Sequence, residues 1–325
     1  MITHQTVRLD EINPEDHPYR ITTKSPIDNL VRSVGLSGII HPVILVKEGG
    51  EQGSKGYVIV SGHRRIEAVK QAGGTFVPAR VADASKDESA AGLFCARSAV
   101  ADNAFSRSLN MVEKAKSVLL LSRYMEPERI VQDSPALFNE PLNLHIVQTL
   151  LTVGGQTGDI HRMILESRVS IKTVVKLETF DPDIKERFIR LFQQIKMTRN
   201  KQLDAITHIR EIAAREEMSI AEFMDSEELD SIVTMDHPDE NLKSERLRNF
   251  LAERRFPEKT KALQAYRAAL KELDFGDTLF LEPPRDFEGD TYRLSFDFKT
   301  ADQFNRALDK LIRARYSERL RGLFR

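Results

Sequence analysis

Segments with strand-like and helix-like patterns alternate over the first hundred residues, and this alternation restricts the fold more than any other feature of the chain. Three apolar runs, at 42–46, 57–60 and 77–81, have the length and the β-branched content of buried strands. The sequence also predicts helices at 27–35 and 62–73, each ending at a glycine. Helices that alternate with strands in this way predict an N-terminal domain of the α/β or α+β class.

Helical periodicity replaces the strand patterns from about residue 111 to residue 222. Its clearest example is an apolar stripe made of Ile184, Phe188, Leu191, Phe192 and Ile195. The overlapping segment 216–240 then contains ten acidic residues and no Lys or Arg. We interpret this acidic stretch as part of a linker, with a solvated helical face as the alternative.

The C-terminal segment predicts a helix, two strands and a second helix. The second strand, 292–299, alternates strictly between apolar and polar residues, so one of its faces is expected to be buried. Thr300 and Gln303 form a capping-box pattern at the start of the last apolar helix. Because about fifty residues bury a core too small to be stable alone, we expect a second copy of the chain to cover the sheet. The module is therefore predicted to form a homodimer.

Together these patterns predict an α+β chain with several parts. Its 325 residues are enough for two or three domains that each bury a core. The expected parts are an N-terminal α/β domain at 1–110, a helical domain at 111–224, the acidic linker at 225–255, and a C-terminal dimerisation module with a basic tail at 256–325.

Composition argues against several other classes. No apolar run approaches the ~20 residues that span a bilayer, and the first residues lack the layout of a signal peptide. The one cysteine, Cys95, rules out an internal disulfide and fits a reducing compartment. The eight histidines are scattered, so a zinc site is not expected. We expect a cytoplasmic protein without a membrane partner.

The segment V-S-G-H-R-R-I-E-A-V-K-Q-A-G-G, residues 60–74, joins a predicted strand to a predicted helix. A helix N-terminus has unpaired N–H groups and a partial positive charge, which together attract anions. Gly62 lets a ligand approach the backbone closely, and Arg64 or Arg65 can clamp phosphate oxygens. From these residues alone, a phosphate site and an ordinary surface turn are equally good interpretations.

Three segments in order carry a family resemblance: G-L-S-G-I-I-H-P-V-I-L-V (35–46), G-H-R-R-I-E-A (62–68) and A-D-N-A-F-S-R-S-L-N-M-V-E-K-A (101–115). The series resembles the ParB family of chromosome and plasmid partition proteins. Their N-terminal domains carry a G-L-x-x-P segment, a G-E-R-R-x-x-A box and an E-N-x-x-R-x-x-L-N-P-x-E-x-A box. The resemblance in sequence is good over the N-terminal domain and loose over the helical domain. At the C-terminus only the order of predicted helices and strands resembles the family.

The resemblance implies a dimeric DNA-binding clamp that binds CTP with Mg²⁺, located on the bacterial nucleoid or a plasmid, with a partition ATPase as a further partner. The implied nucleotide-binding residues are Gly62, His63, Arg64, Arg65, Asp102, Asn103, Arg107 and His41. Asp102 and Asn103 stand where the family's Glu-Asn pair binds phosphate and metal. His41 stands where a polar residue often contacts the base.

The sequence departs from the family pattern at three places. His63 replaces a glutamate, and Met111 replaces a proline. Ser106 stands at the arginine position of the second box, with Arg107 one place later. These departures leave CTP hydrolysis open, so no catalytic residue is assigned.

Simpler roles compete with some of these assignments. Asn103 suits the start of a helix as a capping residue. Asp102 by itself is interpreted as a solvated charge, and His41 is interpreted as a turn residue before Pro42.

Two stretches of the chain are basic enough to suggest DNA contact. Residues 162–215 carry 12 Lys or Arg against 7 Asp or Glu, and the last sixteen residues carry 6 against 1. Such charges would contact phosphates and make DNA affinity depend on salt; a solvated helical surface is the alternative. The expected contacts are Arg162, Arg168, Lys172, Lys176, Arg199 and Lys201, together with Arg313, Arg315, Arg319 and Arg321 in the tail. The segment 129–150, which follows the second box, lacks the pattern of a helix-turn-helix.

Two other functional classes remain open. One is a non-catalytic scaffold or regulator on the ParB fold. The other is an enzyme on that fold, a nuclease or a small-molecule kinase, although no dense carboxylate cluster indicates two-metal chemistry. Sulfiredoxins share the fold, but their site would need a cysteine directly before the His-Arg pair, where this chain has Gly62.

Overall fold

The structure is a computed structural model of the chain. It describes residues 2–13, 15, 17–24, 26–47, 56–83, 88–235, 239–273, 275 and 279–323. The chain divides into two compact units, Met1–Phe180 and Asp181–Arg325. The fold is of the α+β class, as the sequence predicts.

The first unit is built on a four-stranded mixed sheet. Its strands, in spatial order, are β1 (Ile2–Arg8), β4 (Phe76–Asp83), β2 (Val43–Lys47) and β3 (Tyr57–Ser61). The central pair β4 and β2 is parallel, and each edge strand is antiparallel to its neighbour. A 3-10 turn, Leu9–Glu11, follows β1.

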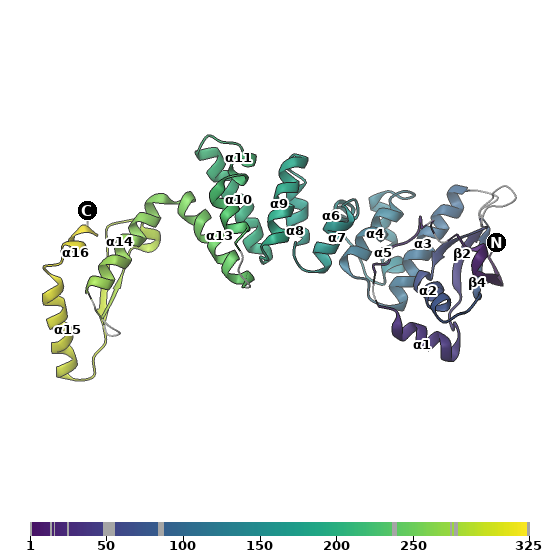
Figure 1. The fold of residues 1–325 in the computed structure, drawn as a ribbon, viewed down its shortest axis with the longest axis horizontal. Helices are drawn as coiled ribbons and strands as arrows, with labels where there is room; N and C mark the ends of the chain where they lie inside the picture. Colours follow the sequence, from purple (N-terminus) through teal and green to yellow (C-terminus); the bar gives the residue numbers. More distant parts are fainter. Residues whose placement is uncertain are drawn as a thin grey trace. The chain divides into compact units, whose positions relative to one another are not determined.

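Helices cover both faces of this sheet (Figure 1). The helices α1 (Asp28–Ser37) and α2 (His63–Gln71) accompany one face, and α3 (Glu88–Ser106) packs on the other. Successive residues of β2 therefore enter different cores: Val43 belongs to the cluster that contains Ile66 of α2, and Ile44 to the cluster that contains Ala99 of α3. Burial on both faces explains why β2 reads as a continuous apolar run.

Five further helices complete the first unit: α4 (Met111–Leu121), α5 (Pro127–Phe138), α6 (Leu144–Gly154), α7 (Gly158–Leu165) and α8 (Ile171–Leu177). A capping box between Asn110 and Glu113 begins α4. The last residue of α6 lies very close to α4, because a Cβ atom built on Gly154 would be 2.6 Å from the carbonyl oxygen of Ala115. Cys95 is fully buried in α3 and belongs to the core of the first unit.

The second unit begins with helices and ends with a small α/β module. Its elements are α9 (Pro182–Gln194), α10 (Arg199–Arg215), α11 (Ile220–Met224), α12 (Glu227–Val233), α13 (Glu240–Arg255), α14 (Pro257–Leu273), β5 (Leu279–Glu282), the 3-10 turn Arg285–Phe287, β6 (Arg293–Phe296), α15 (Ala301–Ala314) and α16 (Glu318–Gly322). The apolar stripe predicted for α9 is confirmed, since Phe188, Leu191 and Phe192 are buried.

The expected acidic linker at 225–255 is wrong for the residues that the structure describes. Two helices, α12 and α13, occupy most of this range, and α13 packs against α10. Leu229, Leu247 and Leu251 are buried on the inner faces of these helices. The acidic residues instead line solvated helical faces, which is the alternative that the sequence left open. The other domain boundaries stay predictions.

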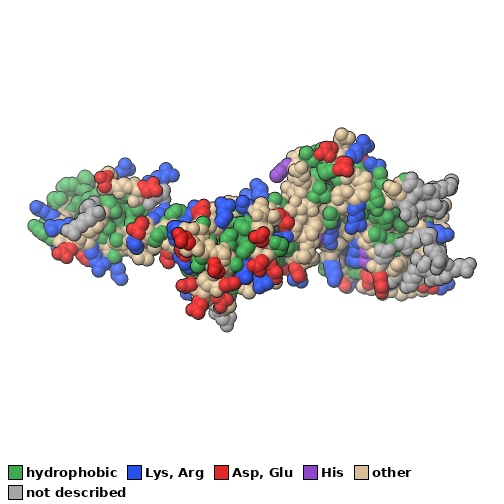
Figure 2. Space-filling model, turned by 90° about the horizontal axis from the view of Figure 1, so that it is seen from above, with side chains coloured by type: hydrophobic (Ala, Val, Ile, Leu, Met, Phe, Trp, Pro, Cys, Tyr) green, Lys and Arg blue, Asp and Glu red, His purple; other side chains and the backbone are tan. Residues whose placement is uncertain are grey.

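The helix–strand–strand–helix order at the C-terminus is confirmed, but the apolar face of its last two elements is not covered. Leu294 in β6 is 44% exposed, although the alternation predicts a buried face. Phe304, Leu308 and Ile312 recur at i, i+4 and i+8 on α15 and are all exposed. Hydrophobic side chains accordingly gather on the surface of the C-terminal module in Figure 2. Among the described residues, no helix has the length and hydropathy to cross a membrane.

Candidate functional site

The turn between β3 and α2 requires a glycine for two reasons. Gly62 has φ +104°, a left-handed backbone conformation that is strained for any residue with a side chain. A Cβ atom at this position would also lie 2.7 Å from Cγ1 of Val43. The N-cap residue of α2 is Gly62, which has no side chain to cap the helix, so the first N–H groups and the partial positive charge of α2 remain available to a ligand.

The two boxes that the sequence singled out meet at this turn. Arg65, in the first turn of α2, donates from Nη2 to Oδ2 of Asp102 near the end of α3, at 2.7 Å. The other terminal nitrogen of Arg65 donates to the carbonyl oxygens of His41 and Pro42, at 2.8 and 3.0 Å. Asp102 also accepts from the buried Ser61 hydroxyl at 2.5 Å. These bonds hold the Arg65 guanidinium in one place between three segments of the chain.

Asn103 is positioned by the same cluster. Its Nδ2 donates to the carbonyl oxygen of Ala99 at 2.8 Å and approaches Ser61 Oγ at 3.4 Å. Asn103 lies in the last turns of α3, so it does not start a helix as the simpler interpretation suggested. Ser106, at the family's arginine position, donates from its hydroxyl to the carbonyl oxygen of Asp102.

Arg107 has a different partner from Arg65. It forms a bidentate pair with Glu113 of α4, at 2.7 and 2.8 Å, and Glu113 is only 2% exposed. Glu113 also accepts from the backbone N–H of Thr23 at 3.0 Å and of Asn110 at 3.1 Å. Burial alone would raise the pKa of Glu113, but these hydrogen bonds, led by those from Arg107, hold the pKa below its usual value.

A cleft of about 310 Å³ opens where these residues converge, and we name it the Arg65 cleft. Its lining is Thr22, Leu30, His41, Gly62, Arg64, Arg65, Asp102, Asn103, Ser106 and Arg107. Seven of the eight residues expected to bind nucleotide are in this set. The exception is His63, which lines a separate cavity and packs edge-on against the ring of His17, with 5.2 Å between ring centroids.

The Arg65 cleft fits a phosphate chain with a divalent cation. Three arginines and an uncapped helix N-terminus favour an anion. Asp102 supplies one carboxylate and Asn103 one amide oxygen, and Mg²⁺ commonly takes one or two such groups together with substrate phosphates. Among the residues that the structure describes, no group of three His, Cys, Asp or Glu side chains could hold a metal ion by itself.

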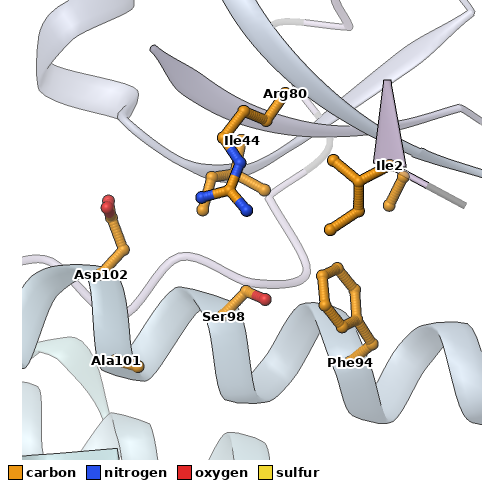
Figure 3. A pocket seen from close by; sticks show the side chains of 8 residues that line it. Ile2, Ile44, Arg80, Phe94, Ser98, Ala101 and Asp102 are labelled. Atoms are coloured by element: carbon orange, nitrogen blue, oxygen red, sulfur yellow. The ribbon is translucent and has the colours of Figure 1, made fainter. Parts of the chain in front are cut away.

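A smaller cavity of about 220 Å³ also contacts Asp102. The guanidinium of Arg80 and the hydroxyl of Ser98 point into it, and Ile2 and Phe94 close its other end (Figure 3). Asp102 therefore lies between two cavities, and only the Arg65 cleft contains the arginines of the first box.

The residues expected to contact DNA are divided between the two units. Arg162 lies in α7 and pairs with Asp159 at 2.8 Å, while Lys172 and Lys176 lie in α8. Arg168 precedes α8, and Arg199 and Lys201 begin α10 in the second unit. In the tail, Arg313 lies in the last turn of α15 and Arg315 directly follows that helix. Arg319 pairs with Glu272 at 2.8 Å, and Arg321 lies in α16.

The segment 129–150, in which the sequence shows no helix-turn-helix pattern, ends inside α6. The helices α6 and α7 are joined by three residues, 155–157, a connection as short as the turn of a helix-turn-helix. Asn143 caps α6, Gly155 follows it, and Thr157 caps α7.

Comparison with known proteins supports the resemblance. The ParB N-terminal domain family matches residues 2–95. The probable chromosome-partitioning protein ParB of Campylobacter jejuni is 26% identical over 145 residues, covering 44% of this chain and 47% of that protein. That of Mycobacterium leprae is 32% identical over 113 residues, covering 34% and 32%. The chain thus matches about a third to a half of the length of these relatives.

Solved ParB structures are also similar to the chain. One is the C-terminally truncated ParB of Caulobacter crescentus complexed with CTP-gamma-S, at 17% identity and a TM-score of 0.26, covering 57% of this chain and 99% of that one. This likeness is too low to carry an argument about the site. The family match, the curated relatives and the order of the boxes instead carry the comparison: residues 2–95 match the ParB N-terminal domain family, and the chain is ParB-like.

Proposed function

We propose that this ParB-like chain is a DNA-binding dimer that binds CTP with Mg²⁺ in the Arg65 cleft and acts in plasmid or chromosome partition. The observation that carries the nucleotide proposal is the convergence of the two boxes. Residues 37 positions apart, Arg65 and Asp102, are joined at 2.7 Å beside an uncapped helix N-terminus. A triphosphate with a divalent cation needs cations, N–H groups and a carboxylate in one place.

Each part of the cleft has a proposed role. The N-terminus of α2 and the guanidinium of Arg64 would receive phosphate oxygens, since no side chain caps this end. Asp102 and Asn103 would hold Mg²⁺, which would neutralise phosphate charge when bound. The hydroxyl of Thr22 is buried without a hydrogen-bond partner among the described residues, so a polar edge of the base is a suitable partner for it.

Calorimetric titration of CTP, ATP and GTP with Mg²⁺ tests this role. We expect selective binding of CTP to the wild type and a loss of roughly tenfold or more in Arg65→Ala, because the substitution removes a positive charge from the cleft and leaves Asp102 without its partner. Arg32→Ala is the matched control, since Arg32 is exposed on α1 outside the cleft. Equal affinity of Arg65→Ala and the wild type for CTP would refute the site.

A scaffold without nucleotide is the second candidate. The observation that favours it is that Arg65 and Arg107 are already bonded to carboxylates in the absence of ligand. A ligand would have to compete with Asp102 for Arg65. The same titration decides between the candidates, because the scaffold predicts no binding of any of the three nucleotides.

We propose that α6 and α7 form the helix-turn-helix and that basic residues of α8 contact DNA phosphates. Lys172 and Lys176 lie one turn apart on α8, and among the described residues no ion pair joins either of them to a carboxylate. We expect the double variant Lys172→Glu/Lys176→Glu to weaken DNA binding and to reduce the salt slope by about 2. Lys47→Glu, on an exposed strand end of the sheet, is the control. An unchanged salt slope would count against this contact.

We propose that the exposed apolar face of α15 is the dimer interface. Leu308 and Ile312 are 42% and 54% exposed on adjacent turns of this helix. A contiguous exposed apolar face of this kind is typical of a protein–protein interface. Leu308→Asp should convert a sedimenting dimer into a monomer. Leu36→Asp changes an equally apolar residue that is 87% exposed on α1, and should leave the dimer intact. A wild-type chain that sediments as a monomer would refute the interface.

A further inference from the structure

A second cavity lies between α2 and the described residues of 17–24 and 26–27, and it shares only Arg64 with the Arg65 cleft. We name it the His63 cavity. Its volume is about 360 Å³, which is in the range of small-molecule sites. Its lining is His17, Arg20, Thr23, Lys24, Ile27, Ile59, His63, Arg64, Ile66, Glu67 and Lys70.

The sequence builds this cavity from one helix face and one anchored segment. His63, Glu67 and Lys70 are spaced i, i+4 and i+7, so they share a face of α2. The segment opposite is anchored by Ile21, which is 2% exposed, and by the bond from the Thr23 N–H to Glu113. The walls are therefore held by the core on one side and by a buried carboxylate on the other.

The charges around the His63 cavity are unbalanced. Its lining contains four cationic side chains and a single carboxylate, that of Glu67. Among the described residues, no ion pair joins Arg20, Lys24 or Lys70 to a carboxylate. Burial and then the positive charge of Arg20 lower the pKa of His63, and the same two causes lower the pKa of Lys116 on α4. The electrostatic potential in the cavity is therefore positive, because one carboxylate does not neutralise four cationic side chains.

Polar atoms without partners gather at the same place. His17 Nδ1, His63 Nε2 and Arg64 Nε are buried and have no hydrogen-bond partner among the described residues. A buried polar group left without a partner costs roughly 1–3 kcal/mol, so native structures rarely cluster three of them. A ligand that accepts hydrogen bonds would satisfy the arginine N–H, and a neutral imidazole whose unpartnered nitrogen carries the proton can donate to the same ligand.

We propose that the His63 cavity binds a phosphate-type oxyanion, either free phosphate or the phosphate group of a small phosphorylated molecule. Arg20, Lys24 and Lys70 supply the charge at the exposed mouth. Arg64, His17 and His63 supply donors at the buried end. Ile27, Ile59 and Ile66 form an apolar wall that would contact the rest of a phosphorylated molecule. This site shares Arg64 with the Arg65 cleft but none of the other residues that line that cleft, and it does not rest on the proposed nucleotide function.

The test follows the histidine ring signals of the full chain by NMR while inorganic phosphate is added, and then phenyl phosphate. We expect saturable shifts of the His17 and His63 signals. Tighter binding of phenyl phosphate would assign the site to phosphorylated molecules, and equal binding would assign it to free phosphate. Arg20→Gln and Lys70→Gln should each weaken the binding by roughly tenfold, because each removes a charged partner from the anion. Both residues are exposed, so these variants are expected to fold.

Two controls separate this site from its alternatives. Arg32→Gln removes the same charge outside the cavity and should leave the phosphate affinity unchanged. Arg65→Ala, which impairs the neighbouring cleft, should leave the shifts of His17 and His63 unchanged as well. The proposal is overturned if phosphate moves neither histidine signal, if Arg32→Gln weakens binding as much as Arg20→Gln, or if Arg65→Ala abolishes the shifts.

Discussion

The buried imidazole of His63 should make the stability of the chain depend on pH. Desolvation, and then the positive charges of Arg20 and His17, lower its pKa from 6.5 to about 3. In the unfolded chain the same group titrates near 6.5. Between these two values the unfolded state binds more protons than the folded state, so stability is complete above about pH 6.5 and is lost as the pH falls.

The size of the effect follows from the two pKa values. Lowering the pH from about 7.5 to about 5 should reduce the free energy of unfolding by about 2 kcal/mol through this one residue. The assay is urea denaturation of the wild type and of His63→Gln at both pH values, followed by circular dichroism. Because Gln does not titrate, the variant should lack this part of the pH dependence, and the double difference isolates His63.

NMR titration of the His63 ring provides the direct check. We expect no protonation of His63 in the folded chain down to about pH 5 in a buffer without phosphate. A ring that titrates near 6.5, or a wild type and a variant with the same pH dependence, would refute the reasoning. Added phosphate should raise the pKa of His63, because a bound oxyanion favours the charged imidazole.

Three further substitutions test the packing around the site, each measured as a change in the free energy of unfolding in urea. Gly154→Ala should destabilise the fold by about 1–3 kcal/mol, because the added Cβ atom would clash with the backbone of α4. The control Gly35→Ala lies in open space on α1 and should be neutral or stabilising. Equal effects of the two substitutions would contradict the predicted clash. Gly62→Ala should cost about 1–3 kcal/mol through its positive φ and its contact with Val43, and a neutral result would show that the turn can adjust. Glu113→Gln should cost about 3 kcal/mol by leaving the Arg107 guanidinium without its buried partner, and a loss below about 1 kcal/mol would mean that the pair contributes little.

Sequence patterns predicted the parts of the fold that depend on local periodicity. The run of β2 and the helix stop at Gly73 could be located because apolar period and glycine position are local properties. The stripe of α9 was found for the same reason. The acidic stretch was misassigned because ten acidic residues outweighed the few apolar ones, although Leu229 and Leu247 are enough to anchor α12 and α13.

Partners of side chains could not be predicted, because they depend on which segments meet. Arg107 was predicted to bind nucleotide, and in the structure its guanidinium is bonded to Glu113. The position of Arg107 in the sequence does not indicate this pairing. His63 lies beside two residues of the nucleotide cleft in sequence but faces another cavity, because neighbours on a helix point about 100° apart. The dimer and DNA contacts stay predictions.

The sequence by itself determined the order of most helices and strands and the two boxes that resemble those of ParB N-terminal domains. These depend on backbone conformation and on residue identity, which are local. Only the tertiary structure decided that Asp102 bonds to Arg65, that Arg107 bonds to Glu113, and that His63 lies in a cationic cavity of its own. These pairings depend on how the sheet brings distant segments together, and burial then makes each pairing energetically significant.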